Sequence, residues 1–225
     1  MLPLARLLDS LEAFHGAQLP DWPTDPYQFL IWWHCGYPAS DAACAGGWAS
    51  LKNRFEVDPE SLLSANAGEL AAALKPGGMV PELRATRLKE IAERVQKEFD
   101  GDLCGALRRM PIAKARTALK KFPGIADPGA DRILLFAGIT PLPAVPSNCP
   151  HVLLRLQLGY QPEKYSETYG EAQRMITDAI PEKLDARIRA YLLLKRHGQE
   201  TCKRTNPKCK VCPIADNCSW PDTRR

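Results

Sequence analysis

Apolar residues recur at helical spacing through most of this chain, and that periodicity limits its possible folds more than any other feature. One stripe of this kind opens the chain, and a second runs between 88 and 99. No stretch alternates between apolar and polar residues as a half-buried strand does. The sequence therefore predicts an all-α protein of roughly ten helices, with prolines at their starts and stops. The N-terminal stripe consists of Leu4, Leu7, Leu8, Leu11 and Phe14; further helices are expected over 61–74, 112–121, 128–137, 168–180 and 184–197.

Length and charge place broad limits on function. The 225 residues can bury a real core, and the net charge of +4 permits a nucleic-acid partner without requiring one. The longest apolar run, residues 29–37, is too short to span a bilayer. Asp9 and Glu12 interrupt the opening segment, so it does not read as a secretory signal. We therefore expect a cytoplasmic protein that does not bind membranes.

Four of the eight cysteines crowd into the C-terminal tail, with the spacing C-x6-C-x2-C-x5-C. In a reducing compartment such a group suggests a metal centre rather than disulfides. Structural zinc usually takes two short C-x2-C pairs held apart in sequence, whereas four-cysteine ligation also suits an iron–sulfur cluster. The spacing favours the cluster and keeps zinc as the alternative. The four cysteines are Cys202, Cys209, Cys212 and Cys218.

A second motif lies in the middle of the chain, where residues 119–138 read LKKFPGIADPGADRILLFAG. Lys120 and Lys121 end one expected helix, a Pro-Gly turn follows, and a second helix begins near Ala130. In such a hairpin the backbone N–H groups of the turn and of the second helix point outward and can bind a phosphate.

Together these motifs resemble the endonuclease III family of helix-hairpin-helix (HhH-GPD) DNA glycosylases. The turn is similar to the family's PGVG hairpin, with Ala126 in place of the second glycine. The cysteine loop after HGQETC is similar to that family's [4Fe–4S] loop, and residues 26–41 and 83–95 resemble its early helix and the helix leading to the hairpin.

The resemblance implies two helical lobes with a DNA cleft between them. One would be a six-helix barrel with the hairpin, residues 21–140. The other would be a discontinuous domain of residues 1–20 and 141–225, with the cluster loop at 202–218. The implied partner is double-stranded DNA, bound by a monomer that is associated with the nucleoid. The implied DNA-binding residues are Gly124, Ile125, Ala126, Gly129, Tyr37, Lys203, Arg204, Lys208 and Lys210.

The residues that would carry the family's chemistry are missing. The lysine that forms a Schiff base falls on Pro128, and no lysine occurs between Lys121 and Lys164. The aspartate that stabilises the cationic sugar falls on Cys149 or Pro150.

Substitutes for that aspartate exist in the sequence, and each also has a structural interpretation. Asp131 and Asp41 can be surface or capping carboxylates, Cys149 a packed thiol, and His151 a helix-start residue. We therefore expect, at most, a monofunctional DNA N-glycosylase of base-excision repair without lyase activity. A non-catalytic protein that recognises damaged or distorted duplex DNA is the alternative, so the sequence leaves open whether the chain is an enzyme.

Overall fold

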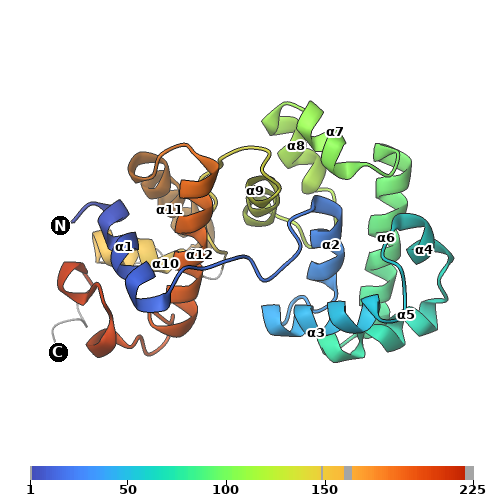
Figure 1. Ribbon diagram of the computed structural model, residues 1–225, viewed down its shortest axis with the longest axis horizontal. Coiled ribbons are helices and arrows are strands. Elements are labelled where there is room, and N and C mark those ends of the chain that lie inside the picture. The colour runs from blue at the N-terminus through green and yellow to red at the C-terminus, as the bar shows by residue number, and fades with distance from the viewer. Residues whose placement is uncertain (1, 148, 160–163, 221–225) are drawn as a thin grey trace. The chain divides into compact units, whose positions relative to one another are not determined.

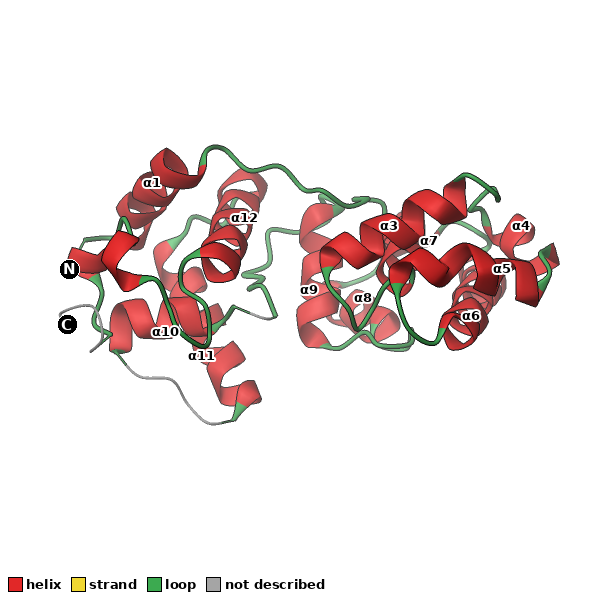
Figure 2. Ribbon diagram, turned by 90° about the horizontal axis from the view of Figure 1, so that it is seen from below, coloured by secondary structure: helices red, strands yellow, loops and turns green. Residues whose placement is uncertain are grey.

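A computed structural model describes residues 2–147, 149–159 and 164–220. These residues form twelve α-helices and three short 3-10 helices, and no strand occurs among them (Figures 1 and 2), which confirms the all-α prediction. None of the described helices combines the length and the apolar character needed to span a bilayer. The α-helices are α1 (Leu4–His15), α2 (Pro26–His34), α3 (Asp41–Lys52), α4 (Pro59–Ser64), α5 (Ala67–Leu74), α6 (Pro81–Phe99), α7 (Leu103–Arg109), α8 (Ile112–Leu119), α9 (Asp127–Phe136), α10 (His151–Leu158), α11 (Tyr165–Ala179) and α12 (Leu184–Glu200), and the 3-10 helices are η1 (Lys75–Gly77), η2 (Cys209–Val211) and η3 (Ala215–Asn217).

The chain divides into two compact units. The central unit is Asp21–Ile125, and the terminal unit combines Met1–Pro20 with Ala126–Arg225. The division falls inside the hairpin, earlier than the boundary at 140 suggested by the sequence. Helix α9 groups with the terminal unit, where Phe136 packs edge-on against Tyr191 of α12 at a centroid distance of 5.1 Å.

The central unit holds α2 to α8, and α6 packs against both α4 and α5. Residues 61–74, expected as one helix, form two. The break lies at Ala65, which is extended, and at Asn66, whose side chain accepts from the amides of Gly68 and Glu69. An asparagine at this position satisfies two amides that a new helix start would otherwise leave without acceptors, so the chain restarts a helix there.

The terminal unit holds α1 and α9 to α12. The leucines of the N-terminal stripe are buried as expected, but Phe14 is 51% exposed, so its place in the stripe was wrong. Helix α1 is held to α12 by Arg189, which donates to Glu12 at 2.6 Å and to Asp9 at 2.9 Å.

Candidate DNA-binding and metal-binding sites

The turn between α8 and α9 depends on a glycine. Gly124 has φ +68°, a left-handed conformation that costs other L-residues about 1–2 kcal/mol. The Ile125 amide donates to the carbonyl of Phe122, which closes the turn at 3.3 Å. The sequence Phe-Pro-Gly-Ile therefore has a local reason to reverse direction here.

Several backbone amides around this turn have no protein acceptor. Within the described residues, the amides of Gly124, Ala126 and Gly129 donate to none. Ala126 is the N-cap of α9, and Gly129 lies in that helix's first turn. Such amides at a helix start are suited to an anion.

Sequence reasoning overlooked one feature of this stretch, the carboxylate of Asp127. Asp127 is the first residue of α9 and is half-buried. A carboxylate at the N-terminus of a helix stabilises that helix through its dipole. The same carboxylate places negative charge near a site that would bind phosphate. The signal was present in the sequence, directly after the Pro-Gly-Ile-Ala turn.

His34, at the end of α2, and Tyr37, just after it, lie next to the turn. The Nε2 of His34 donates to the Pro123 carbonyl at 2.7 Å. A Cβ on Gly124 would lie 3.4 Å from His34 and 3.5 Å from Tyr37, and Tyr37 stacks on Trp33 at 4.7 Å. Burial lowers the pKa of His34 to about 4, so the ring is neutral at pH 7. Two residues predicted to meet DNA, Tyr37 and Gly124, are therefore neighbours.

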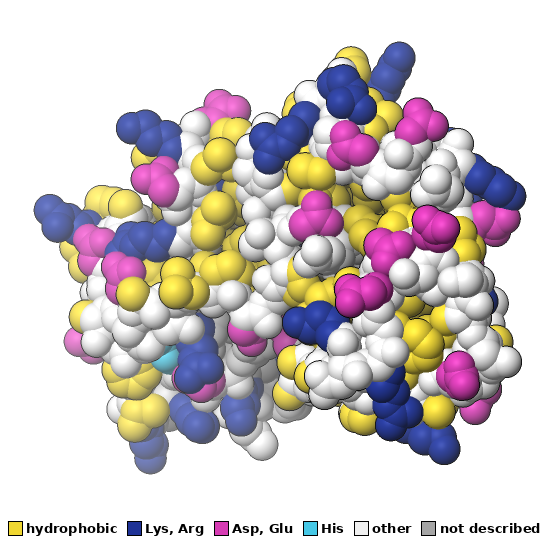
Figure 3. All heavy atoms as spheres, turned by 45° about the vertical axis from the view of Figure 1, so that its right-hand side comes forward, with side chains coloured by type: hydrophobic (Ala, Val, Ile, Leu, Met, Phe, Trp, Pro, Cys, Tyr) yellow, Lys and Arg dark blue, Asp and Glu magenta, His cyan; other side chains and the backbone are white. Residues whose placement is uncertain are grey.

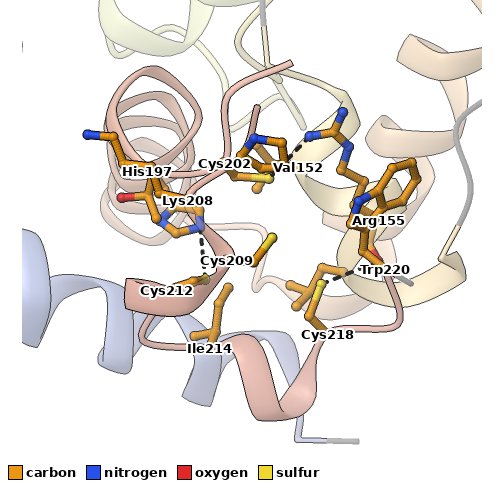
Figure 4. Close-up of a pocket in the computed structure, with 13 residues that line it drawn as sticks. Val152, Arg155, His197, Cys202, Lys208, Cys209, Cys212, Ile214, Cys218 and Trp220 are labelled. Carbon is orange, nitrogen blue, oxygen red and sulfur yellow. Dashed lines mark hydrogen bonds between the residues drawn. The ribbon is translucent and has the colours of Figure 1, made fainter. Parts of the chain in front are cut away.

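The four tail cysteines line one pocket at the end of the terminal unit (Figure 4). All four lie in the described part of the chain, and none is joined in a disulfide. Apolar side chains of Val152, Leu156 and Ile214 line the same pocket. Across the described residues, no three His, Cys, Asp or Glu side chains converge closely enough to hold a single metal ion.

Helix α10 holds the loop that starts at the first of these cysteines. Arg155 donates to the carbonyls of Lys203 and Arg204, both at 2.8 Å, and its Nη1 lies 3.8 Å from the Cys202 sulfur. His151 Nε2 donates to the Cys202 carbonyl at 2.9 Å. Two buried side chains, one turn apart on α10, therefore fix the backbone of this loop.

Burial raises the pKa of three of the four thiols, Cys202, Cys212 and Cys218, and that of Cys212 reaches about 11. The cause is removal of the thiolate from water, and a bound metal centre would reverse it because the cation stabilises the charged sulfur. His197 Nε2 lies 3.7 Å from the Cys212 sulfur.

This loop also carries the basic side chains predicted to meet DNA, one of which, Lys208, lines the cysteine pocket. All four predicted cations are exposed. They are Lys203, Arg204, Lys208 and Lys210.

The predicted substitutes for the missing acid lie mainly in structural contacts. Asp131 is 1% exposed, and its Oδ2 accepts from Gln173 at 2.8 Å and from Tyr169 at 3.2 Å. Cys149 is buried so tightly under α12 that a Cβ on Gly198 would lie 2.4 Å from its sulfur.

The structure also places Pro150, Pro128 and Asp41, the other positions considered for the family's chemistry. Pro150 caps α10 and is buried, and Pro128 lies in the first turn of α9. Asp41 is the first residue of α3, follows the N-cap Ser40, and is half-buried. Among the three acidic or imidazole candidates, Asp41 alone is not fully buried.

Known proteins resemble the chain in sequence and in fold. No protein-family model matches it. It is 28% identical over 159 residues to a thymine/uracil-DNA glycosylase of Pyrobaculum aerophilum, covering 71% of this chain and 65% of that protein, just under two thirds of its length. It is 26% identical over 163 residues to a thymine-DNA glycosylase of Aeropyrum pernix, covering 72% of this chain and 69% of that protein.

The fold is similar over the whole chain to that of an endonuclease III in a trapped covalent DNA intermediate. The TM-score is 0.74 at 20% identity, covering 100% of this chain and 99% of that one. The described residues thus have the all-helical fold of endonuclease III. In sequence the chain resembles the two DNA glycosylases, and in fold it resembles endonuclease III.

Proposed function

We propose that this protein is a DNA N-glycosylase of base-excision repair that excises uracil or thymine from duplex DNA. The observation that carries the proposal is the turn at Gly124, where a left-handed glycine and amides without protein acceptors are suited to bind a phosphate. The pyrimidine substrate rests on the names of the two archaeal relatives.

The chemistry is hydrolysis without strand cleavage. A Schiff-base lyase needs a primary amine beside the turn, and Pro128 has none. No lysine between 121 and 164 can take its place from a neighbouring position. Breaks in the DNA are therefore expected only where alkali cleaves the abasic product.

A [4Fe–4S] cluster is the proposed cofactor, and zinc is its less suited alternative. The fit rests on the four thiols that line one mostly apolar pocket and on their spacing in sequence. Four-cysteine ligation with an adjoining N–H donor, here Arg155 to Cys202, is chemistry that an iron–sulfur cluster accepts. When bound, the cluster would stabilise the tail, which has little apolar core of its own.

Duplex DNA is the proposed partner, bound by a single copy of the chain. Two separate features would contact the backbone, the Gly124 turn and the exposed loop of Lys203 and Arg204. A protein with this substrate would act in the cytoplasm, at the nucleoid.

A second candidate function rests on the absence of the family's catalytic lysine and aspartate from their expected positions. Asp131 is hydrogen-bonded to Tyr169 and Gln173, and both residues at the expected place of the family's acid, Cys149 and Pro150, are buried and are not acids. A chain that binds the DNA backbone but lacks a catalytic acid would recognise damaged DNA without excising a base.

One assay separates the two functions. Cluster-loaded protein is incubated with duplexes carrying G·U, G·T, an abasic site or no lesion, and products are scored with and without hot alkali. Breaks at G·U or G·T that need alkali support the glycosylase. Spontaneous breaks would overturn the absence of lyase. Tight binding without excision would identify the recognition protein. Asp41→Asn, compared with Asp131→Asn, then tests whether the half-exposed acid supports excision.

A further inference from the structure

Positive charge in the central unit is concentrated in one segment. Residues 21–125 carry 14 Lys and Arg and 13 Asp and Glu. Six of those 14 cations lie between 108 and 121, and no Asp or Glu occurs from 103 to 126. The rest of the unit is therefore net acidic, and α7–α8 is a basic segment that leads into the hairpin. Figure 3 shows Lys and Arg side chains at the upper edge of the view, where α7 and α8 lie.

Helix α8 has one buried side and one exposed side. Ala115 and Leu119 are buried, whereas Lys114, Thr117 and Lys121 are exposed. Lys114 lies on the exposed side of α8, and Lys121 lies two residues past Leu119, the last residue of the helix, at the start of the turn. Lys121 is three residues before Gly124. The exposed side of α8 thus runs directly to the turn.

The segment has no acidic residue of its own to offset these charges, since no Asp or Glu occurs from 103 to 126. The nearby ion pair does not neutralise the segment, because Arg109 and Asp102 are 3.8 Å apart and both are more than half exposed.

We propose that Lys114 and Lys121 form a second contact to the phosphate backbone of duplex DNA, which extends the footprint of the hairpin along α8. The inference rests on the proposed function, since it assumes that the Gly124 turn holds a phosphate. It adds a DNA-binding surface on the first helix of the hairpin, made by side-chain charge rather than by backbone amides.

The test compares two double variants of the full cluster-loaded chain. Lys114→Gln/Lys121→Gln removes the surface. Lys52→Gln/Arg54→Gln removes the same charge from exposed positions at the end of α3 that is far from the Tyr37 turn. Binding to a fluorescein-labelled duplex with an abasic-site analogue is measured by anisotropy at several salt concentrations.

The slope of log affinity against log salt should fall by about 1.8 in the α8 variant, because each phosphate that a lysine no longer neutralises lowers it by ~0.9. The control variant should retain the wild-type slope. Equal slopes in the two variants would overturn the proposal. Wild-type protein that fails to bind duplex DNA would overturn both this inference and the proposed function. A reduced slope in a protein that excises nothing would support the surface and refute the glycosylase.

Discussion

Replacing Gly124 by alanine should weaken DNA binding more than it weakens the fold. A Cβ at this position would lie 3.4 Å from His34 and 3.5 Å from Tyr37, which is ordinary contact, so a clash contributes little. The main cost is the backbone, because φ +68° costs an alanine about 1–2 kcal/mol. Alanine recovers about 0.4–1 kcal/mol by restricting the unfolded chain. We expect a net loss of about 1 kcal/mol in the free energy of unfolding.

The effect on DNA follows from how alanine relieves that strain. If the residue leaves the left-handed region, the amide of residue 124 rotates away from the phosphate. One hydrogen bond to a charged group contributes about 1.5–3 kcal/mol, so affinity for every duplex should fall at least tenfold. The loss should be equal for lesion-containing and intact DNA, because a phosphate contact carries no sequence information.

Gly138→Ala is the matched control. Gly138 has φ +65°, and no atom lies within 4 Å of the place that an alanine methyl group would take, so it carries the same strain away from the hairpin turn. Urea denaturation should give similar losses of stability for the two variants, and anisotropy should show weaker DNA binding for Gly124→Ala alone. Unchanged binding in Gly124→Ala, or equal weakening in both variants, would refute the role of the turn.

Two further predictions concern buried groups. Arg155→Met should free the loop at Lys203 and Arg204, seen as faster hydrogen exchange of the amides of residues 203–206 and 208 and faster loss of the visible absorbance of the proposed cluster, whereas Arg189→Met should leave both unchanged. Equal exchange rates would contradict the bonds that Arg155 makes to this loop. The pKa of His34 is lowered from 6.5 to about 4, so the unfolded chain takes up a proton first and stability should fall as the pH drops from 6.5 to 4, by at most about 3 kcal/mol. His34→Gln should lessen that decline in urea midpoints, and an identical pH profile would show that the ring does not contribute.

The sequence was sufficient where local physics decides the structure. Leucines at helical spacing predicted the buried face of α1, and Pro-Gly predicted the turn at Gly124. Prediction from the sequence failed where a single polar side chain determines where a helix begins. Asn66 divides one expected helix into two by accepting two amides, and apolar periodicity does not register such a cap.

Burial of polar groups could not be predicted either. Asp131 was a candidate acid because it follows the hairpin, but only the fold brings Tyr169 and Gln173 to its carboxylate. His151 was a candidate because it flanks the acid's expected place, and in the structure it binds the Cys202 carbonyl. These partners lie 38 to 51 residues away in sequence, so spacing gave no signal of them.

The start of α10 explains why a single substitution would not restore the family's acid. Cys149 is 2% exposed and is packed under α12 against Gly198, whose lack of a side chain allows the close approach. A carboxylate there would be buried against helix backbone, and an unpaired buried charge costs far more than a packed thiol. The same helix uses His151 and Arg155 to hold the cysteine loop. Helix α10 therefore packs the terminal unit and positions the cysteine loop, so a search for a replacement acid would begin with the half-exposed Asp41 in the central unit.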